Sequence, residues 1–143
     1  MEQMMAERKN FNDFNIGDQF KETRVIPYEE VERFADVVGD DNPIHLDKEF
    51  AEKSSFKGRI VHGAFLIGFV SKILGVDFPG PGSIYLSQEI KFLRPVYVDS
   101  SVQIILEIID MDTDKQRFTI DTSILNDKNK TCVKGKALIW YPD

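Results

Sequence analysis

This sequence has little cysteine, a shortage of basic residues and no long apolar run. Its single cysteine, Cys132, excludes a disulfide within the chain. A lone thiol is typical of the reducing cytoplasm, and we predict that location. The 24 acidic residues outnumber the 18 basic ones and give a formal net charge of −6. That balance disfavours nucleic-acid binding, which needs a basic face to neutralise phosphates.

The N-terminal stretch MEQMMAERKN mixes charges of both signs and has no apolar core, so it is unlike a signal peptide. No apolar run approaches the roughly 20 residues of a membrane span, so we expect no membrane association. Hydrophobic residues make up 42% and charged residues 29%, which is ordinary for a globular protein. We therefore predict one soluble domain over residues 1–143, in which residues 1–12 form a polar, frayed leader.

Local patterns in the first half of the chain predict one strand and two helices. Residues 18–26 are predicted to be a strand, and PYEEVERFADVVG, residues 27–39, a helix with apolar side chains on one face. LDKEFAEKS, residues 46–54, is predicted to be a short helix with Asp47 as its N-cap and Phe50 facing inward.

The segment RIVHGAFLIGFVSKILG, residues 59–75, predicts the central helix of the domain. Between Arg59 and Lys72 it has no formally charged side chain. Apolar residues occupy every side of a helical wheel, which predicts a helix buried all round. Gly75 is a natural C-terminal stop.

Beyond residue 82 the sequence alternates in the manner of strands. In SIYLSQEIKF, residues 83–92, apolar side chains such as Ile84 and Leu86 share one side, with Gln88 the one exception there. VQIILEIID, RFTIDTSIL and CVKGKALIWY follow, separated by the turn-like MDTDKQ and NDKNK. Short connections make such a sheet antiparallel. We predict an α+β domain in which this sheet wraps around the apolar helix.

The stretch GDDNPIHLD, residues 39–47, is the candidate for chemistry. Asp40 and His45 are five residues apart, so on a regular helix they would point about 140° away from each other. Pro43 drives Asn42 out of the helical region, and this break allows the two side chains to meet. A carboxylate and an imidazole can then share one water, one accepting its proton while the other orients it. From the residues alone, a solvated capping loop is the commoner arrangement.

Three successive motifs give the chain a family resemblance. GDDNPIHLD, RIVHGAFLIGFVSKILG and GSIYLSQEIKFLRPVYVDS resemble the signatures of the MaoC-like (R)-specific enoyl-CoA hydratases, over roughly residues 16–140. The resemblance implies the hot-dog fold, an antiparallel sheet wrapped around a long central helix. It implies reversible (R)-specific hydration of short-chain trans-2-enoyl-CoA to (R)-3-hydroxyacyl-CoA, within fatty acid metabolism. It implies no cofactor, no metal, and a homodimer with each site near the subunit interface.

By position, the resemblance assigns the catalytic pair to Asp40 and His45 and the oxyanion glycine to Gly63. It makes Ser71 the serine that supports the histidine, with Asn42 a further supporting residue of the motif. Hydration places negative charge on the thioester oxygen, and an N–H in the first turn of a buried helix suits that charge. A glycine also lets the carbonyl come close, because it has no Cβ.

Several of these residues have a structural alternative. Gly63 could serve tight packing between helix and sheet, and Ser71 could bond back to the carbonyl four residues earlier. We interpret His62 as a core histidine bonded to a backbone carbonyl, in preference to a second catalytic base. Asp41 is expected to be an exposed spectator.

Two other functions are compatible with the same fold. Many hot-dog thioesterases place an acidic group on the central helix, but IVHGAFLIGFVSKIL contains no Asp or Glu. A non-catalytic acyl-CoA-binding module would not need both Asp40 and His45. A metal site made from these two residues with Asp47 and His62 lacks a recognised ligand spacing. Hydration is therefore our prediction.

The sequence also bears on the substrate. The central helix keeps large side chains, including Phe65 and Phe69, which leaves little room for a long acyl tail. We therefore predict acyl chains of about four to six carbons, because overpacking a closed pocket costs roughly 1–3 kcal/mol. The basic residues near the motifs are candidates for the CoA phosphates, although most such side chains are merely solvated; they are Lys57, Arg59, Lys91 and Arg94.

Overall fold

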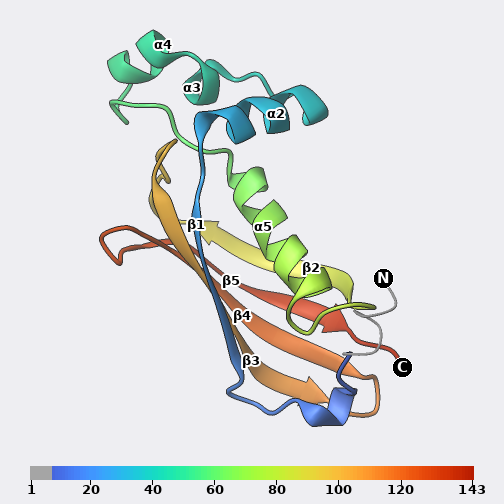
Figure 1. Ribbon diagram of the computed structural model, residues 1–143. Coiled ribbons are helices and arrows are strands. Elements are labelled where there is room, and N and C mark those ends of the chain that lie inside the picture. The colour runs from blue at the N-terminus through green and yellow to red at the C-terminus, as the bar shows by residue number, and fades with distance from the viewer. Residues whose placement is uncertain (1–7) are drawn as a thin grey trace.

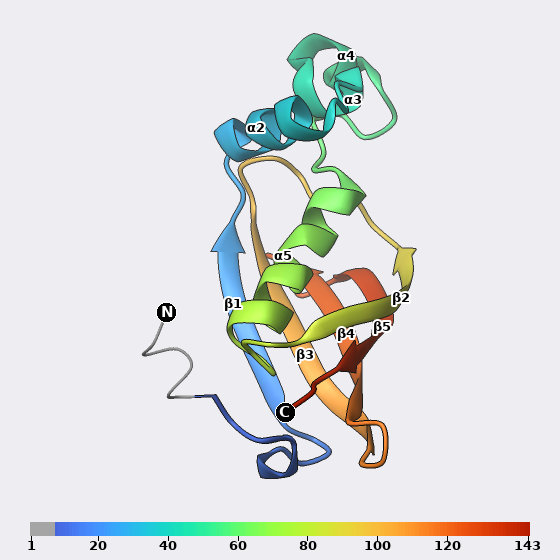
Figure 2. The ribbon, with the colours of Figure 1, turned by 90° about the vertical axis from the view of Figure 1, so that its right-hand side faces the viewer.

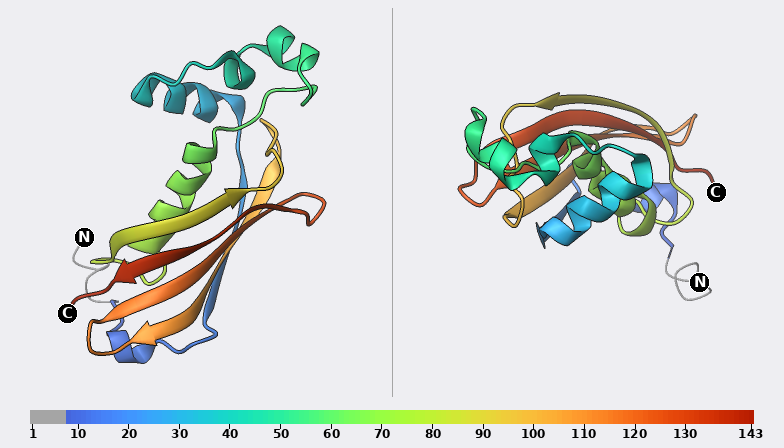
Figure 3. Two further views of the ribbon diagram at one scale, coloured as in Figure 1. Left: turned by 180° about the vertical axis from the view of Figure 1, so that it is seen from behind. Right: turned by 90° about the horizontal axis from the view of Figure 1, so that it is seen from above.

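The computed structural model describes residues 8–143, which form a curved antiparallel sheet wrapped around one long helix (Figures 1 and 3). The strands lie in the order β1-β3-β4-β5-β2, and every neighbouring pair is antiparallel. They are β1 (Gln19–Val25), β2 (Ile84–Phe92), β3 (Ser101–Asp112), β4 (Arg117–Asn126) and β5 (Thr131–Trp140). The helices are η1 (Phe11–Asp13), α2 (Tyr28–Val38), α3 (Pro43–Leu46), α4 (Lys48–Lys53) and α5 (Gly63–Val76). The predicted α+β architecture is confirmed.

The core lies between α5 and the concave face of the sheet. Alternate residues of β3 and β4 are buried, and they meet buried side chains of α5 such as Phe69 and Ile73. Each large apolar side chain buried in this way contributes about 1.5–3 kcal/mol. Figure 2 shows α5 crossing the sheet between its two edge strands, β1 and β2.

Helix α5 differs from its prediction in two respects. It begins at Gly63 and not near residue 59, because the preceding backbone pairs with the segment between β2 and β3, the N–H of Val61 donating to the carbonyl of Val96 at 2.8 Å. It is also not buried all round, since one face that includes Ala64, Gly68 and Ser71 is exposed. The helical wheel shows apolar residues in every direction, so it does not distinguish the face on which the small side chains gather.

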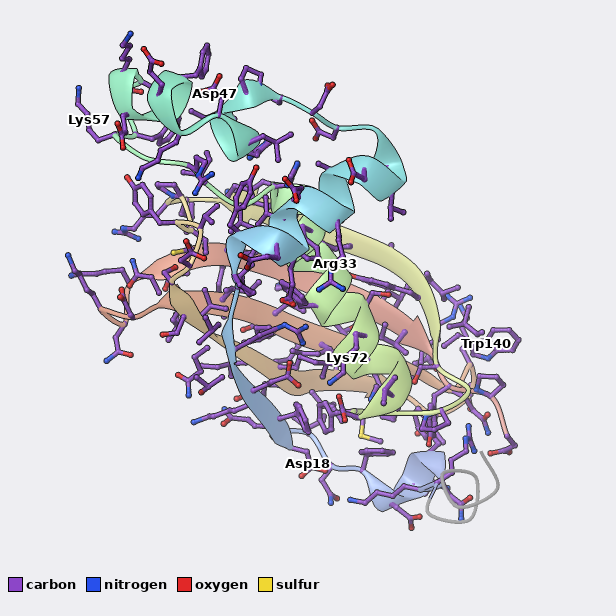
Figure 4. All side chains as sticks on the ribbon, turned by 45° about the horizontal axis from the view of Figure 1, so that its top comes forward. Asp18, Arg33, Asp47, Lys57, Lys72 and Trp140 are labelled. Carbon is purple, nitrogen blue, oxygen red and sulfur yellow. The ribbon has the colours of Figure 1, made fainter. Side chains whose placement is uncertain are left out.

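Lys72 holds the C-terminal end of α5 in place. Its ammonium forms ion pairs of 2.9 Å with Glu22 of β1 and with Asp77, the residue after the helix. In Figure 4 the labelled Lys72 lies on α5 on the side toward β1. The helix continues past Gly75, the predicted stop, to Val76.

Strand β2 has an irregularity that the alternation pattern does not predict. Its pairing with β5 shifts register between Tyr85 and Ser87, which leaves Leu86 out of the ladder. An extra residue of this kind reverses the alternation of the strand. Tyr85 is half-buried and donates to Gln88, while Ile84 and Leu86 are 45% and 41% exposed.

The N-terminal region is more ordered than the predicted frayed leader. Phe11 is only 3% exposed and stacks on Phe118 at a ring-centroid distance of 4.5 Å. An aromatic side chain of this size anchors the segment to the core. The remainder of the predicted leader, residues 1–7, lies outside the described residues.

Helices α2, α3 and α4 lie together at one end of the sheet, beside the N-terminus of α5 (Figures 1 and 2). The predicted cap of α4 is confirmed, because Asp47 Oδ1 accepts from the N–H of Phe50 at 3.0 Å. The inward orientation predicted for Phe50 is wrong, as half of its surface is exposed. No helix within residues 8–143 has the length and apolar character needed to cross a membrane.

Candidate active site

The site begins where α2 ends. Gly39 adopts a left-handed conformation, with φ 82°, and its N–H donates to the carbonyl of Ala35, which closes the helix. Asn42 then caps α3, its Oδ1 accepting from the N–H of Ile44 at 3.2 Å. Pro43 occupies the first turn of α3, where its missing N–H has no cost. Asn42 and Pro43, from which the break between the two helices was predicted, therefore form it.

This break brings Asp40 and His45 together, and His62 joins them. One carboxylate oxygen of Asp40 and one ring nitrogen of each histidine lie within 4.8 Å of one another. The two imidazole rings stack, with centroids 3.7 Å apart and an interplanar angle of 27°. His45 and His62 are 9% and 2% exposed, whereas Asp40 is open to solvent. The predicted meeting of carboxylate and imidazole is thus present, at the edge of a buried patch.

The hydrogen bond of His45 defines its tautomer. Its Nδ1 lies 2.7 Å from the carbonyl oxygen of Ile60. A carbonyl can only accept, so Nδ1 carries the hydrogen and donates it. The neutral ring therefore has its lone pair on Nε2, where it can accept a proton. Ile60 is fixed in turn, since its N–H donates to the carbonyl of Ile44.

The surroundings of His45 favour its neutral form. Burial lowers the pKa of His45 below its ordinary value of 6.5, and His62 lowers it further. The Ile60 carbonyl and the Asp40 carboxylate act in the opposite direction, and burial is the largest of the four effects. A base held neutral in this way is ready to take a proton near neutral pH.

Gly63 is the first residue of α5, and no side chain caps this end of the helix within the described residues. Its N–H is therefore available at the positive end of the helix dipole. The ring of Phe92 covers the same residue: a Cβ on Gly63 would lie 2.6 Å from Cε1 of Phe92. Gly63 therefore combines both features considered for it. It packs tightly against Phe92, and its N–H is free to donate to an oxyanion.

A cavity of about 500 Å³ opens beside these groups. Its wall is mostly apolar and includes His45, Gly63, Leu66 and Phe92, with Arg94 at one side. A second cavity of about 530 Å³ is at the other end of α5, between the N-terminal segment and the residues after the helix, and contains no histidine. We place the site in the first cavity, because His45 and Gly63 line it.

Comparison with known proteins identifies the family of the chain. The family described as MaoC like domain matches residues 13–129. The chain belongs to this family. It is 35% identical over 127 residues to an (R)-specific enoyl-CoA hydratase of Aeromonas caviae, covering 89% of this chain and 95% of the relative. It is 33% identical over 133 residues to a 3-hydroxybutyryl-CoA dehydratase of Methylorubrum extorquens, covering 92% and 83%.

The structures agree as well. An R-hydratase from Pseudomonas aeruginosa in the unliganded form superposes with a TM-score of 0.88 at 34% identity, over 93% of this chain and 85% of that one. The five-stranded antiparallel sheet around α5 is the hot-dog fold of these hydratases, as expected from the sequence.

Three residues of the MaoC-like motifs have positions that refine their expected roles. Asp41 is exposed and lies outside the cluster, as predicted. Asn42 supports the pair indirectly, because its N–H donates to Asp40 Oδ1 at 3.3 Å while its side chain caps α3. Ser71 is exposed on α5, eight residues beyond Gly63 and thus about 12 Å from it along the helix axis, and its supporting role stays a prediction.

Two partners in this MaoC-like site have no signature in the sequence. The carbonyl of Ile60 orients His45 through the backbone, and a backbone contact of this kind has no residue signature. Phe92 was predicted only as one apolar residue of a strand. The interpretation of His62 as a core histidine bonded to a carbonyl is confirmed, but that carbonyl belongs to Asp40.

Asp40, His45 and His62 are also the three groups in residues 8–143 that could together hold a metal ion. Nitrogen lone pairs lie in the plane of their ring. Because the two rings are stacked and nearly parallel, their lone pairs do not converge on one point. The arrangement fits a shared water better than a metal.

Proposed function

We propose that this MaoC-like protein hydrates short-chain trans-2-enoyl-CoA to (R)-3-hydroxyacyl-CoA and catalyses the reverse dehydration. The observation that carries the proposal is the meeting of Asp40 and His45 beside the uncapped N-terminus of α5. The relatives named as (R)-specific enoyl-CoA hydratase and 3-hydroxybutyryl-CoA dehydratase support it. No cofactor is needed, since the addition of water involves no net oxidation or reduction.

The proposed reaction uses one water between the two side chains. His45 Nε2 accepts a proton from this water, while the Asp40 carboxylate accepts a hydrogen bond from the O–H that the water keeps. The water oxygen bonds to C3, and the electrons of the double bond move toward the thioester carbonyl. The N–H of Gly63 donates to the oxygen on which negative charge develops. The imidazolium then returns its proton to C2, which completes the addition and restores neutral His45.

The cavity suggests how the substrate is held. The enoyl group would lie against the apolar wall near Leu66 and Phe92, and we expect the bulk of these side chains to limit the acyl chain to about four to six carbons. Of the basic residues considered for CoA, Arg94 borders the cavity, so we assign it to a CoA phosphate. Arg59 lies over the ring of Tyr28 at 3.9 Å and is already engaged.

Incubation with crotonyl-CoA tests the proposal. We expect the absorbance of the conjugated thioester to fall, and chiral analysis to show (R)-3-hydroxybutyryl-CoA with no free CoA thiol. Thiol release without a hydroxyacyl product would favour the thioesterase. Saturable binding with neither product would favour an acyl-CoA-binding module. The absence of Asp and Glu from α5 already disfavours the thioesterase.

We also propose a homodimer in which the free edge of β2 pairs with its copy. The two apolar side chains exposed at the bulge, Ile84 and Leu86, lie along that edge. An open edge of this kind requires a cover. A cytoplasmic location remains a prediction from the sequence.

A further inference from the structure

His62 contacts both Asp40 and His45 and directly precedes Gly63 in the chain. Its Nε2 lies 3.1 Å from the backbone carbonyl oxygen of Asp40. The face of its ring lies 3.7 Å from that of His45. It is the N-cap residue of α5, directly before Gly63. A single side chain thus contacts both members of the acid–base pair and begins the helix that supplies the amide.

The hydrogen bond of His62 also defines its tautomer. The Asp40 carbonyl can only accept, so Nε2 of His62 carries the hydrogen. Its Nδ1 is then a bare acceptor, buried with no hydrogen-bond partner among the described residues. An unpaired buried acceptor destabilises a fold, and an apolar ring of similar size would avoid that cost. The choice of an imidazole over an apolar ring is therefore explained by its Nε2–H, and not by general packing.

We propose that His62 is a positioning residue for the Asp40–His45 pair. Its Nε2–H fixes the backbone at Asp40, which otherwise lies in an exposed connection between helices. Its ring fixes the plane of the His45 imidazole and shields one face of it from water. The inference rests on the proposed function, because it assigns a role within the same site.

The two contacts can be separated by substitution. In His62→Phe the ring that covers His45 remains, but the donor to Asp40 is lost. In His62→Gln the side-chain amide can still donate to the Asp40 carbonyl, but it covers less of the His45 ring. The groups whose charge bears on His45 are Asp40 and His62, and Arg94 borders the same cavity. Neither substitution removes the charge of Asp40 or of Arg94.

The rate of crotonyl-CoA hydration, measured across pH, distinguishes the contact of His62 with Asp40 from its contact with His45. His62→Phe should lower kcat at least about tenfold, with KM changed less than about threefold, because the carboxylate loses its position. The acid limb of its kcat/KM profile should move only slightly to higher pH, because the charge of His62 that lowers the pKa of His45 is lost while the ring still covers His45. His62→Gln should retain more of kcat, but its acid limb should move further to higher pH, since it loses the same charge and a hydrated imidazole is also more easily protonated. Any other pattern in the folded variants overturns the inference.

Phe11→Leu is the matched control, because Phe11 is equally buried but packs on Phe118 at the far end of the sheet. It should lower the melting temperature and leave kcat and the acid limb unchanged. A change in either would mean that loss of stability alone explains the His62 variants, and the inference would fail.

The wild-type protein provides a test that needs no variant of His62. The chain has only two histidines, so nitrogen-15 spectra contain two imidazole systems, assigned with His45→Gln. We expect the Nε2–H tautomer for His62 and the Nδ1–H tautomer for His45. An Nδ1–H tautomer at His62 rules out the bond to Asp40 and overturns the inference. Wild type without hydratase activity would instead refute the proposed function, whatever the tautomer.

Discussion

His45 lies against aromatic and aliphatic side chains, and burial is the largest influence on its charge. Because its pKa in the folded protein is below 6.5, the neutral base persists at a pH where an exposed histidine is already protonated. We expect the acid limb of kcat/KM to lie below pH 6.5. The measurement is the initial hydration rate at subsaturating crotonyl-CoA between about pH 5 and 8.

The lowered pKa of His45 also determines how the free energy of unfolding changes with pH. A lowered pKa means that protonation favours the unfolded chain, so His45 should reduce the free energy of unfolding as the pH falls below 6.5. His45→Gln should lack this contribution. An acid limb above pH 6.5 would show that His45 is more hydrated than the structure indicates, or that another group is the base.

Gly63 can be tested by adding one methyl group. In Gly63→Ala the new Cβ would lie 2.6 Å from the Phe92 ring, so the ring must move and the methyl group intrudes where the thioester oxygen approaches. We expect kcat/KM for crotonyl-CoA to fall at least about tenfold. Phe92→Leu alone should have a smaller effect. If packing were the only role of Gly63, the double variant Gly63→Ala with Phe92→Leu would recover activity.

Single residues also show what local sequence can reveal. The break between Asp40 and His45 was predictable from Pro43, but the residues alone favoured a solvated loop, and only the family resemblance favoured their meeting. The bond from His62 to Asp40 joins positions 22 residues apart, and no local pattern encodes that contact. Ser71 was assigned by resemblance alone, and its role stays a prediction.

At the scale of secondary structure, α5 forms one wall of the cavity. Leu66 is 3% exposed and borders the site, whereas Ile73 is fully buried two turns further along the same helix and does not. We expect wild-type kcat/KM to be highest for about four to six carbons, since each further methylene gains only ~0.8 kcal/mol and needs space. Leu66→Ala should extend the preference to longer chains.

The matched control for chain length is Ile73→Ala. Both substitutions remove a buried side chain and should destabilise by about 2–5 kcal/mol, but only Leu66→Ala enlarges the cavity. The measurement is kcat/KM across even-numbered trans-2-enoyl-CoAs. Wild-type efficiency that rises steadily with chain length would mean an open tunnel, and the size prediction would be wrong while hydration could still stand.

The elements themselves were largely predictable, since apolar periodicity located every strand and α2, α4 and α5 within a few residues. The errors have local causes that periodicity does not encode. The bulge of β2 reverses its alternation at Leu86. Helix α5 begins late because Ile60 and Val61 pair with residues 96–97, a contact across more than 30 positions of the chain.

At the scale of the whole molecule, β2 has no neighbouring strand from residues 8–143 on one of its sides and forms an edge of the sheet. We expect a homodimer at micromolar concentration, in which the edges of two β2 strands pair. Leu86→Lys places a charge on that edge and should shift the mass measured by light scattering toward the monomer. Val37→Lys is the control, because Val37 is 84% exposed on α2. A monomeric wild type, or equal effects of the two substitutions, would contradict this assembly.

We expect Asp40 and His45 to perform the hydration together. The direct measurement compares crotonyl-CoA hydration by Asp40→Asn, His45→Gln and Asp41→Asn, with folding checked by circular dichroism. We predict that the first two lower kcat by about 10²- to 10⁴-fold, the usual contribution of an acid–base group. Asp41→Asn, on an exposed side chain outside the cluster, should stay within about twofold. A crippled Asp41→Asn beside a nearly unaffected Asp40→Asn would contradict the account.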